Sequence, residues 1–563
     1  MIDADFEADL QSYVEIQAST LQRLMGRGTR FNLPWAQRSY AWREEHMRRL
    51  CVDLAKAFYS PNKRYRLGFI RLARSNGDGV VSLVDGQQRL ISLSLVFAFL
   101  IERLSPGKTR DALQSCLTRD GQPVVQVQPH MQAFFAERLT PGRHTADDDA
   151  DMSALNWSEI RLLSNQQVIE PTLADCHIST DQLDDFGQFL LTRCIIIVET
   201  VASEAEALQI LATEEDTGLP FVSAERAKVT LLSLLPRTDR DEASALWDRH
   251  QNQIGSEALS RVLGYIRTQA LGESWDGRGT SPIETDLAKQ FEIDQRGLVF
   301  LKHEFEPHAR NFAALCQAED ADEASMLSDA DWSEDVFAKV ETLRWLDRDY
   351  WIAPALAFLK RHGTTHPEAA EFFRRLDYLA WIDRIGATSP DRSSKLFAAL
   401  CSEIKEVTSF SRIKRLEPAP GTLKQARENL DSRTFYYKPW SHLILRRIGH
   451  QLGIDPGAKD DLHVTGEHIL PRRPKKTSNW HRDFTQQGHP VGQYSDRIGN
   501  IAHLSRSDNQ LCANGEWPFK RPILTESRFA LSIDAARHDR WTPETISERS
   551  RHLISTFFES FER

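Results

Sequence analysis

Apolar residues recur along this chain with two different spacings, and each spacing predicts a different kind of element. Up to about residue 236, short runs of aliphatic and β-branched residues, as at 65–72, 80–84 and 194–198, are typical of strands. From about residue 237 to 440 the apolar positions lie three and four residues apart, as at 353–359 and 372–380, which predicts amphipathic helices. The pattern therefore predicts an α+β protein that is mostly helical, with an α/β domain at its N-terminus.

The last part of the chain has a pattern of its own. A helix expected at 440–452 is stopped by Asp455-Pro456-Gly457, a strand-like stretch follows at 462–464, and an amphipathic helix is expected at 543–561. At 563 residues the chain is too long for one hydrophobic core. We therefore expect three domains, which are an α/β domain at residues 1–236, a helical domain at 237–440 and a small domain at 441–563.

The composition is that of an ordinary globular protein, with 41% hydrophobic and 27% charged residues. The longest nearly apolar run, residues 90–101, is too short to cross a bilayer and is expected to form a buried helix. The N-terminus is acidic and lacks the basic and apolar regions of a secretion signal, and the seven cysteines include no Cys-x-x-Cys pair. We therefore expect a cytoplasmic protein with no membrane partner, no disulfide framework and no thiolate zinc site.

The formal net charge of −10 is unfavourable for a protein that contacts DNA, because phosphate contacts need Lys and Arg side chains. Net charge averages over the chain, however, and acidic stretches at 147–151 and 319–323 are typical of solvated loops. Basic residues cluster elsewhere, in particular in the last domain. The candidates for contact with DNA phosphates are Arg472, Arg473, Lys475 and Lys476, with a solvated basic loop as the equal alternative.

A candidate phosphate site lies where the strand at 80–84 ends. Gly86 can form a tight turn before the next helix, and the N-terminal amide groups of a helix attract anions. Arg89 adds a bidentate cation, and Asp85 can hold a magnesium ion or orient a water molecule. The alternative is a capping box between Asp85 and Gln88, which needs no ligand. The candidate nucleotide-binding residues here are Asp85, Gly86, Gln87, Gln88 and Arg89.

A second polar pair, Gln37 and Arg38, lies among aromatic residues between Phe31 and Trp42. These residue types can stack on a nucleobase and bind its phosphate. The alternative is an extended strand whose aromatic side chains fill the hydrophobic core. The pattern taken alone favours that alternative.

The C-terminal domain contains the residue types that metal-assisted hydrolysis of a phosphodiester requires. A neutral His468 can take a proton from water near pH 7. The neighbouring Glu467 and the carboxamide oxygen of Asn509 can hold a hard divalent cation, with Mg²⁺ or Mn²⁺ favoured over zinc. Asn500 can hydrogen-bond the backbone or the ring of His468 and fix its orientation. The candidate catalytic residues are thus His468 and Asn500, and the candidate metal ligands are Glu467 and Asn509.

The motifs and their order resemble the GmrSD-type family of modification-dependent (type IV) restriction endonucleases. The resemblance rests on Phe-x-x-Pro-x-x-Gln-Arg-x-Tyr-x-Trp, Leu-Gly-Phe-Ile and Asp-Gly-Gln-Gln-Arg, then on Glu-His-Ile-x-Pro, Gly-Asn and a later Asn. A third N-terminal element, a turn at residues 216–220 followed by Lys228, matches weakly. Ala36 stands where the family has an aromatic residue, and this departure bears on which modified base is recognised.

The resemblance implies a ParB/sulfiredoxin-like N-terminal domain, associated with nucleotide hydrolysis and sensing of modified DNA, and a ββα-metal (HNH, His-Me finger) nuclease domain. It leads to the hypothesis of an antiviral endonuclease that cleaves or nicks modified phage DNA with Mg²⁺ or Mn²⁺. A nucleoside triphosphate bound at the N-terminal domain would control cutting, and assembly as a homo-oligomer stays open. Two alternatives also stay open: a nucleotide-dependent DNA-binding regulator that does not cut, and a nuclease toxin that acts on host nucleic acid.

Overall fold

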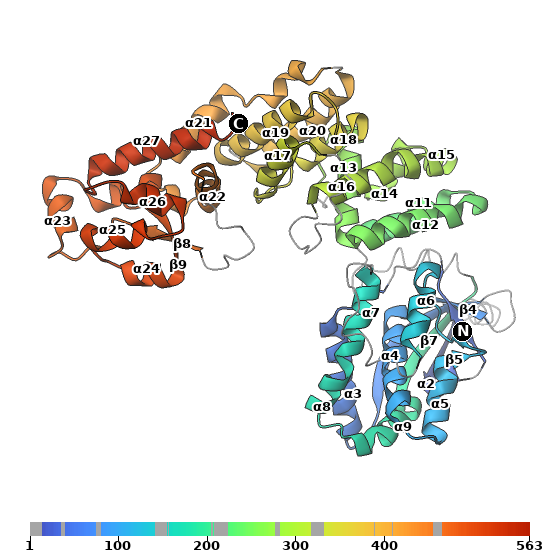
Figure 1. Cartoon of the computed structure of the whole chain (residues 1–563). Coiled ribbons are helices and arrows are strands. Elements are labelled where there is room, and N and C mark those ends of the chain that lie inside the picture. Colours follow the sequence, from blue (N-terminus) through green and yellow to red (C-terminus); the bar gives the residue numbers. More distant parts are fainter. Residues whose placement is uncertain are drawn as a thin grey trace, which may run out of the picture. The chain divides into compact units, whose positions relative to one another are not determined.

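The computed structural model divides the chain into two compact units that are mostly helical (Figure 1). The expectation of a mostly helical α+β protein is therefore confirmed, while the expected division at residues 236 and 440 stays a prediction. The first unit comprises Met1–Gly264 and Gly277–Ala313, and the second comprises Tyr265–Asp276 and Ala314–Arg563. The structure describes residues 14–26, 28–34, 40–74, 80–140, 155, 157–203, 207, 223–275, 282–316, 332–387, 389–407, 409–453 and 464–562.

A mixed sheet of five strands, in the order β1-β7-β3-β4-β2, organises the first unit. Strand β7 pairs antiparallel with β1 and parallel with β3, and β4 pairs antiparallel with β3 and parallel with β2. The strands expected at 65–72, 80–84 and 194–198 are confirmed as β3, β4 and β7. The strands are β1 Val14–Thr20, β2 Arg30–Asn32, β3 Tyr65–Ala73, β4 Val80–Asp85 and β7 Cys194–Val201, with a separate short pair, β5 Thr118–Arg119 and β6 Gln122–Pro123.

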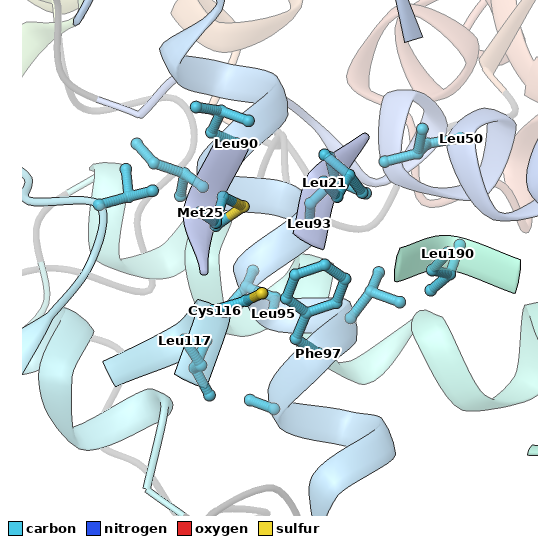
Figure 2. Packing of buried hydrophobic residues seen from close by; sticks show 14 of the residues in the cluster. Leu21, Met25, Leu50, Leu90, Leu93, Leu95, Phe97, Cys116, Leu117 and Leu190 are labelled. Carbon is cyan, nitrogen blue, oxygen red and sulfur yellow. The ribbon is translucent and has the colours of Figure 1, made fainter. Parts of the chain in front are cut away.

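Helix α4, Gln87–Arg103, lies at the centre of the largest hydrophobic core. Each of its residues from Leu90 to Ile101 is buried, as expected for a helix that is apolar on all sides. Figure 2 shows Leu93, Leu95 and Phe97 among labelled side chains of the neighbouring helices. Besides α4, the helices that contribute to this core are α2 Leu21–Met25, α3 Glu44–Tyr59, α5 Lys108–Leu117, α6 Pro129–Arg138, α7 Trp157–Gln167, α8 Ile169–Asp175 and α9 Leu183–Arg193.

A smaller core joins the sheet to the helices that follow it. Val84 of β4 and Val201 of β7 pack with Val229 of α11. Two of the three boundaries between the units along the chain fall within α13 and within α16. These helices are α11 Ser223–Leu234, α12 Arg237–Ile254, α13 Ser256–Leu271, α14 Ile283–Gln290, α15 Ile293–Phe300, the π-helix η3 Leu301–Phe305 and α16 Glu306–Cys316.

In the second unit, one hydrophobic core joins Trp381, Leu430, Ile444 and Leu553, which come from α19, α21, α22 and α27. Helices expected at 353–359, 372–380, 440–452 and 543–561 are confirmed as α18, α19, α22 and α27. Among the residues that the structure describes, no helix is both long enough and apolar enough to cross a lipid bilayer. The helices of this part are α17 Glu334–Arg344, α18 Ile352–His362, α19 Ala369–Gly386, α20 Pro390–Glu406, α21 Pro420–Leu430, α22 Ser441–Gln451 and α27 Pro543–Glu559.

A second core of this unit lies around a two-stranded antiparallel sheet of β8 and β9. Helix α24 follows β9 directly, so the elements have the ββα order that the HNH resemblance implies; the HNH fold itself stays a prediction, as does the ParB-like fold. The elements are β8 Val464–His468, α23 Asn479–Asp483, β9 Ile501–Ser505, α24 Arg506–Cys512, α25 Trp517–Thr525 and α26 Ala530–Ala536.

The turn between β4 and α4 generates a prediction about stability. Gly86 has a φ of +88°, and a Cβ atom at this position would lie 2.3 Å from Cγ2 of Ile70. We expect Gly86→Ala to lower the opening free energy of the α4 amides by about 3 kcal/mol, because strained φ and overpacking each cost on the order of 1–3 kcal/mol. Hydrogen exchange of peptides within α4 measures this effect.

Gly121→Ala is the matched control for this substitution. Gly121 has a φ of +72° but nothing within 4 Å of the added Cβ, so only the backbone strain applies. We expect Gly121→Ala to lower the opening free energy of the amides around its own turn by about 1 kcal/mol. Equal losses in the two variants would show that the contact with Ile70 does not constrain the turn.

Candidate functional site

The turn that precedes α4 does not form the capping box that was the alternative at this site, and other hydrogen bonds hold it. The N-cap residue is Gly86, in the left-handed conformation, and Asp85 Oδ1 accepts a 2.7 Å hydrogen bond from its N–H group. Gln88 Oε1 accepts from the backbone N–H of Ala41 at 2.7 Å. The capping box between Asp85 and Gln88 is therefore wrong, because the Gln88 side chain binds a distant segment of the chain.

Arg89 lies beside this turn as a half-buried cation. Its guanidinium group packs against Gly68, where an added Cβ would lie 3.3 Å from Nη2, and Nη1 donates to the carbonyl of Phe69 at 3.0 Å. Burial lowers the pKa of Arg89, and the Asp85 carboxylate opposes this shift. Within the described part of the chain the guanidinium makes no other hydrogen bond, so its remaining N–H groups can bind an anion.

The two N-terminal motifs converge on α4, although Gln37 and Arg38 lie outside the described residues. The Tyr40 hydroxyl is 2.7 Å from Ser92 Oγ of α4 and accepts from Asn165 Nδ2 at 2.9 Å. Phe31 and Tyr40 are buried in the core, so the stacking of a base on these two rings is wrong and the alternative of core packing is confirmed for them.

The third N-terminal element is described only in part, because residues 216–220 lie outside the described residues. Lys228 of α11 is buried, and its Nζ donates to Asp248 Oδ1 of α12 at 2.7 Å. This ammonium group therefore ties two helices of the first unit together. It is a structural cation in this arrangement.

In the C-terminal site, Glu467 and His468 point to opposite faces of β8, because side chains alternate along a strand. Glu467 is 4% exposed and forms an ion pair with Lys520 of α25. Lys520 also donates to the backbone carbonyl of His468 at 2.9 Å. Burial raises the pKa of Glu467, and the Lys520 ammonium opposes that shift.

The imidazole of His468 is oriented by Asp496. His468 Nε2 lies 3.1 Å from Asp496 Oδ1, and the ring packs against the Tyr436 ring with centroids 4.5 Å apart. Burial lowers the pKa of His468, and the nearby Arg472 cation lowers it further. A neutral imidazole beside a carboxylate carries its proton on Nε2, so Nδ1 has a lone pair. Nδ1 makes no hydrogen bond to a described residue and can accept a proton from water.

Asp496 is a further candidate site residue, which the sequence analysis did not single out. Its Oδ1 also accepts from Arg472 Nε at 2.7 Å, and its Oδ2 accepts from Ser495 Oγ at 3.0 Å. Asp496 belongs to none of the recognised motifs, and nothing in the local sequence distinguishes it from a surface carboxylate. Only the closeness of Asp496 to Asn500 in the sequence offers a signal.

The four basic residues after His468 do not have equal surroundings. Arg472 binds Asp496, and its guanidinium lies over the Tyr437 ring at 4.6 Å. The exposed residues Arg473, Lys475 and Lys476 form no side-chain ion pair with a described residue. Contact between these residues and DNA phosphates stays a prediction.

Asn500 acts on the backbone rather than on the His468 ring. Its Nδ2 donates to the carbonyls of Leu470 at 3.0 Å and Ser495 at 2.8 Å. Its Oδ1 accepts from the backbone N–H of Leu470 at 2.8 Å and from Trp541 Nε1 at 3.0 Å. The side chain is fully buried. Asn500 is therefore a positioning residue, because its amide has no group left to contact a substrate.

Asn509 of α24 lies against β8, where its Nδ2 donates to Thr465 Oγ1 at 2.7 Å. The carbonyl oxygen Oδ1 makes no hydrogen bond to a described residue. No cluster of three or more His, Cys, Asp or Glu side chains suited to a metal occurs among the described residues. Glu467 and Asn509 thus offer one carboxylate and one carboxamide oxygen, a donor set that suits Mg²⁺, which keeps most of its water.

Comparison with protein families matches two parts of the chain. Residues 21–232 match the model of the GmrSD restriction endonuclease N-terminal domain, and residues 423–556 match that of the GmrSD restriction endonucleases C-terminal domain. A comparison with curated proteins finds no match. The two matched ranges contain every candidate site residue and together cover more than half of the chain.

The contacts of Asn500 predict its effect on stability. We expect Asn500→Ala to lower the opening free energy of the β8 and β9 amides by at least about 3 kcal/mol, because several buried polar groups lose their partner. Asn509→Ala is the matched control, with an expected loss of under about 1 kcal/mol at a half-buried site. Hydrogen exchange of peptides from both strands measures the difference. An equal, small loss in both variants would contradict the positioning role of Asn500.

Proposed function

This chain belongs to the GmrSD restriction endonuclease family, and from that premise we propose that it cuts foreign DNA with His468 as the general base. One observation carries the proposal. His468 lies in the matched C-terminal range with a lowered pKa, its Nε2 is bound to Asp496, and its Nδ1 has no partner among the described residues. A histidine in this state is poised to take a proton rather than to give one.

The proposed reaction is hydrolysis of a phosphodiester. Nδ1 of His468 takes a proton from a water molecule, whose oxygen forms a bond to phosphorus while the bond to the leaving oxygen breaks. The leaving oxygen takes its proton from solvent. Asp496 stabilises the imidazolium that forms, as a carboxylate does beside a catalytic histidine.

Glu467 and Asn509 would hold a Mg²⁺ or Mn²⁺ ion, and such an ion would supply positive charge for phosphodiester hydrolysis. In the structure the Glu467 carboxylate faces Lys520, on the face of β8 opposite to His468, so it would have to exchange that ion pair for the metal. Lys520 binds Glu467 and opposes the rise in the pKa of this carboxyl group that burial causes. Residues Arg472, Arg473, Lys475 and Lys476 would place the flanking phosphates. Both the dependence of cutting on a metal ion and the choice of Glu467 and Asn509 as its ligands are part of this proposal.

We further propose that a nucleoside triphosphate binds at the turn before α4 and controls cutting. Gly86 gives the backbone its left-handed turn, and Arg89 offers guanidinium N–H groups beside it. Asp85 would hold the magnesium ion of the nucleotide, and Gln87 and Gln88 would line the site. Gln37 and Arg38 would complete it. Preference for modified phage DNA follows from the family resemblance and is proposed on that ground.

A cleavage assay with phage DNA tests the nuclease. We expect the full-length protein with Mg²⁺ and nucleoside triphosphate to cut phage DNA, and His468→Ala to lower the rate by at least about 100-fold, as loss of a general base does. Removal of the metal with EDTA should abolish cutting. His481→Ala is the matched control, since this histidine of α23 has no side-chain hydrogen bond to a described residue.

The same assay tests the alternatives and the ionisation of His468. Cutting without any nucleotide would favour a toxin, and DNA binding without cutting would favour a regulator. Because the pKa of His468 is lowered, the cutting rate should rise with pH, with the midpoint of the rise below about 6.5, the usual imidazole value. A midpoint above that pH would contradict the role of a His468 with a lowered pKa.

Nucleotide hydrolysis is expected to separate from DNA cutting. Arg89→Ala should abolish hydrolysis, because the phosphates lose their bidentate cation, while His468→Ala should leave hydrolysis unchanged. Release of inorganic phosphate measures the rate. Arg66→Ala is the control, since Arg66 is exposed on the neighbouring strand β3. Loss of hydrolysis in His468→Ala would contradict separate sites.

A further inference from the structure

An exposed aromatic side chain stands at the edge of the His468 site. Tyr437 is 64% exposed, more than the other exposed aromatic side chains that the structure describes. It ends the short 3-10 helix Phe435–Tyr437, in which Phe435 is fully buried. The N–H group of Tyr436 donates to the carbonyl of Asp496 at 3.0 Å. The backbone that carries Tyr437 is therefore anchored by the two residues that precede it.

Three contacts in a row connect this ring to the general base. The Arg472 guanidinium lies over the Tyr437 ring, with 4.6 Å between Cζ and the ring centroid. The same guanidinium binds Asp496, whose carboxylate binds His468 Nε2. A ligand that lies on Tyr437 is thus next to the place where His468 would act.

The neighbouring Tyr436 cannot serve as a second platform. A Cβ atom on Gly466 would lie 2.7 Å from the Tyr436 ring, so this ring packs directly on strand β8. Its edge contacts the His468 imidazole. The Tyr436 ring therefore packs against the site, and Tyr437 is the ring that a ligand can reach.

We propose that Tyr437 stacks on a nucleobase of the DNA substrate that has left the base stack beside the scissile phosphate. This inference rests on the proposed nuclease function and names the substrate class of the same site. Stacking on an aromatic ring needs a free base face, and in an intact duplex both faces of a base are covered by its neighbours. The preferred substrate is therefore DNA with an unpaired nucleotide at the cut, such as a bulge, a flap or a single strand.

The surrounding charges favour a nucleic acid over a protein partner. Arg473, Lys475 and Lys476 are exposed on the segment that follows Arg472. These cations suit the phosphates on both sides of the stacked base. An aromatic ring with an arginine beside it and further cations nearby is the combination that binds single-stranded nucleic acid.

The experiment measures binding in the His468→Ala background of the full-length protein, so that no DNA is cut. The probes are a duplex with one bulged 2-aminopurine and the same duplex with that base paired. We expect the bulged base to lose fluorescence on binding, because it stacks on Tyr437. Tyr437→Ala should abolish this quenching and weaken binding of the bulged duplex about tenfold, and leave the paired duplex unchanged.

Two further variants make the outcome decisive. Tyr437→Trp should retain both quenching and affinity, which a variant that merely disturbs folding would not do. Phe519→Ala removes another exposed ring of the same unit, at 51% exposure, and should change neither. The proposal is overturned if Tyr437→Ala keeps the quenching, or if its affinity for both duplexes falls equally. Normal quenching by a protein that never cuts DNA would instead overturn the nuclease and leave the stacking site standing.

Discussion

The side-chain amide of Asn500 is the contact on which the C-terminal site depends. It binds the backbone of Leu470, just after β8, and the carbonyl of Ser495, just before Asp496. The long connection between the two strands is thereby closed at both ends, and Asp496 is held beside His468. A fully buried amide can do this because all of its hydrogen-bonding groups have partners, whereas an unsatisfied amide would destabilise the fold.

Strand β8 directs its two candidate site residues to opposite faces, because side chains alternate along a strand. Glu467 points inward to the buried Lys520, and His468 points to Asp496 on the opposite face. Lys520 also donates a hydrogen bond to the backbone carbonyl of His468. A residue on the inward face of β8 therefore helps to fix the position of His468. In the first unit, the left-handed Gly86 has a similar supporting role, because its backbone turn places Arg89 at the start of α4.

Local features of the sequence were sufficient to predict many helices and strands. They were insufficient to predict which side chains meet in the site. Strands β3, β4 and β7 and the buried helix α4 could be predicted because their apolar patterns match the local geometry. The capping box at Asp85 was wrong because Gln88 binds Ala41 instead, and that contact joins positions far apart in the chain. The Tyr40 ring is buried, as the core-packing alternative expected, but the sequence alone did not show that its hydroxyl meets Ser92.

The sequence by itself determined the mostly helical class, the positions of the motifs and the family, since these depend on residue order and short-range periodicity. Only the tertiary structure decided which polar groups meet. It assigned Asp496 to His468 and Lys520 to Glu467, and it placed the Asn500 side chain on the backbone of Leu470 and Ser495 rather than on the backbone or ring of His468. The physical reason is that hydrogen bonds and ion pairs act over a few ångströms, while the residues that form them are far apart along the chain.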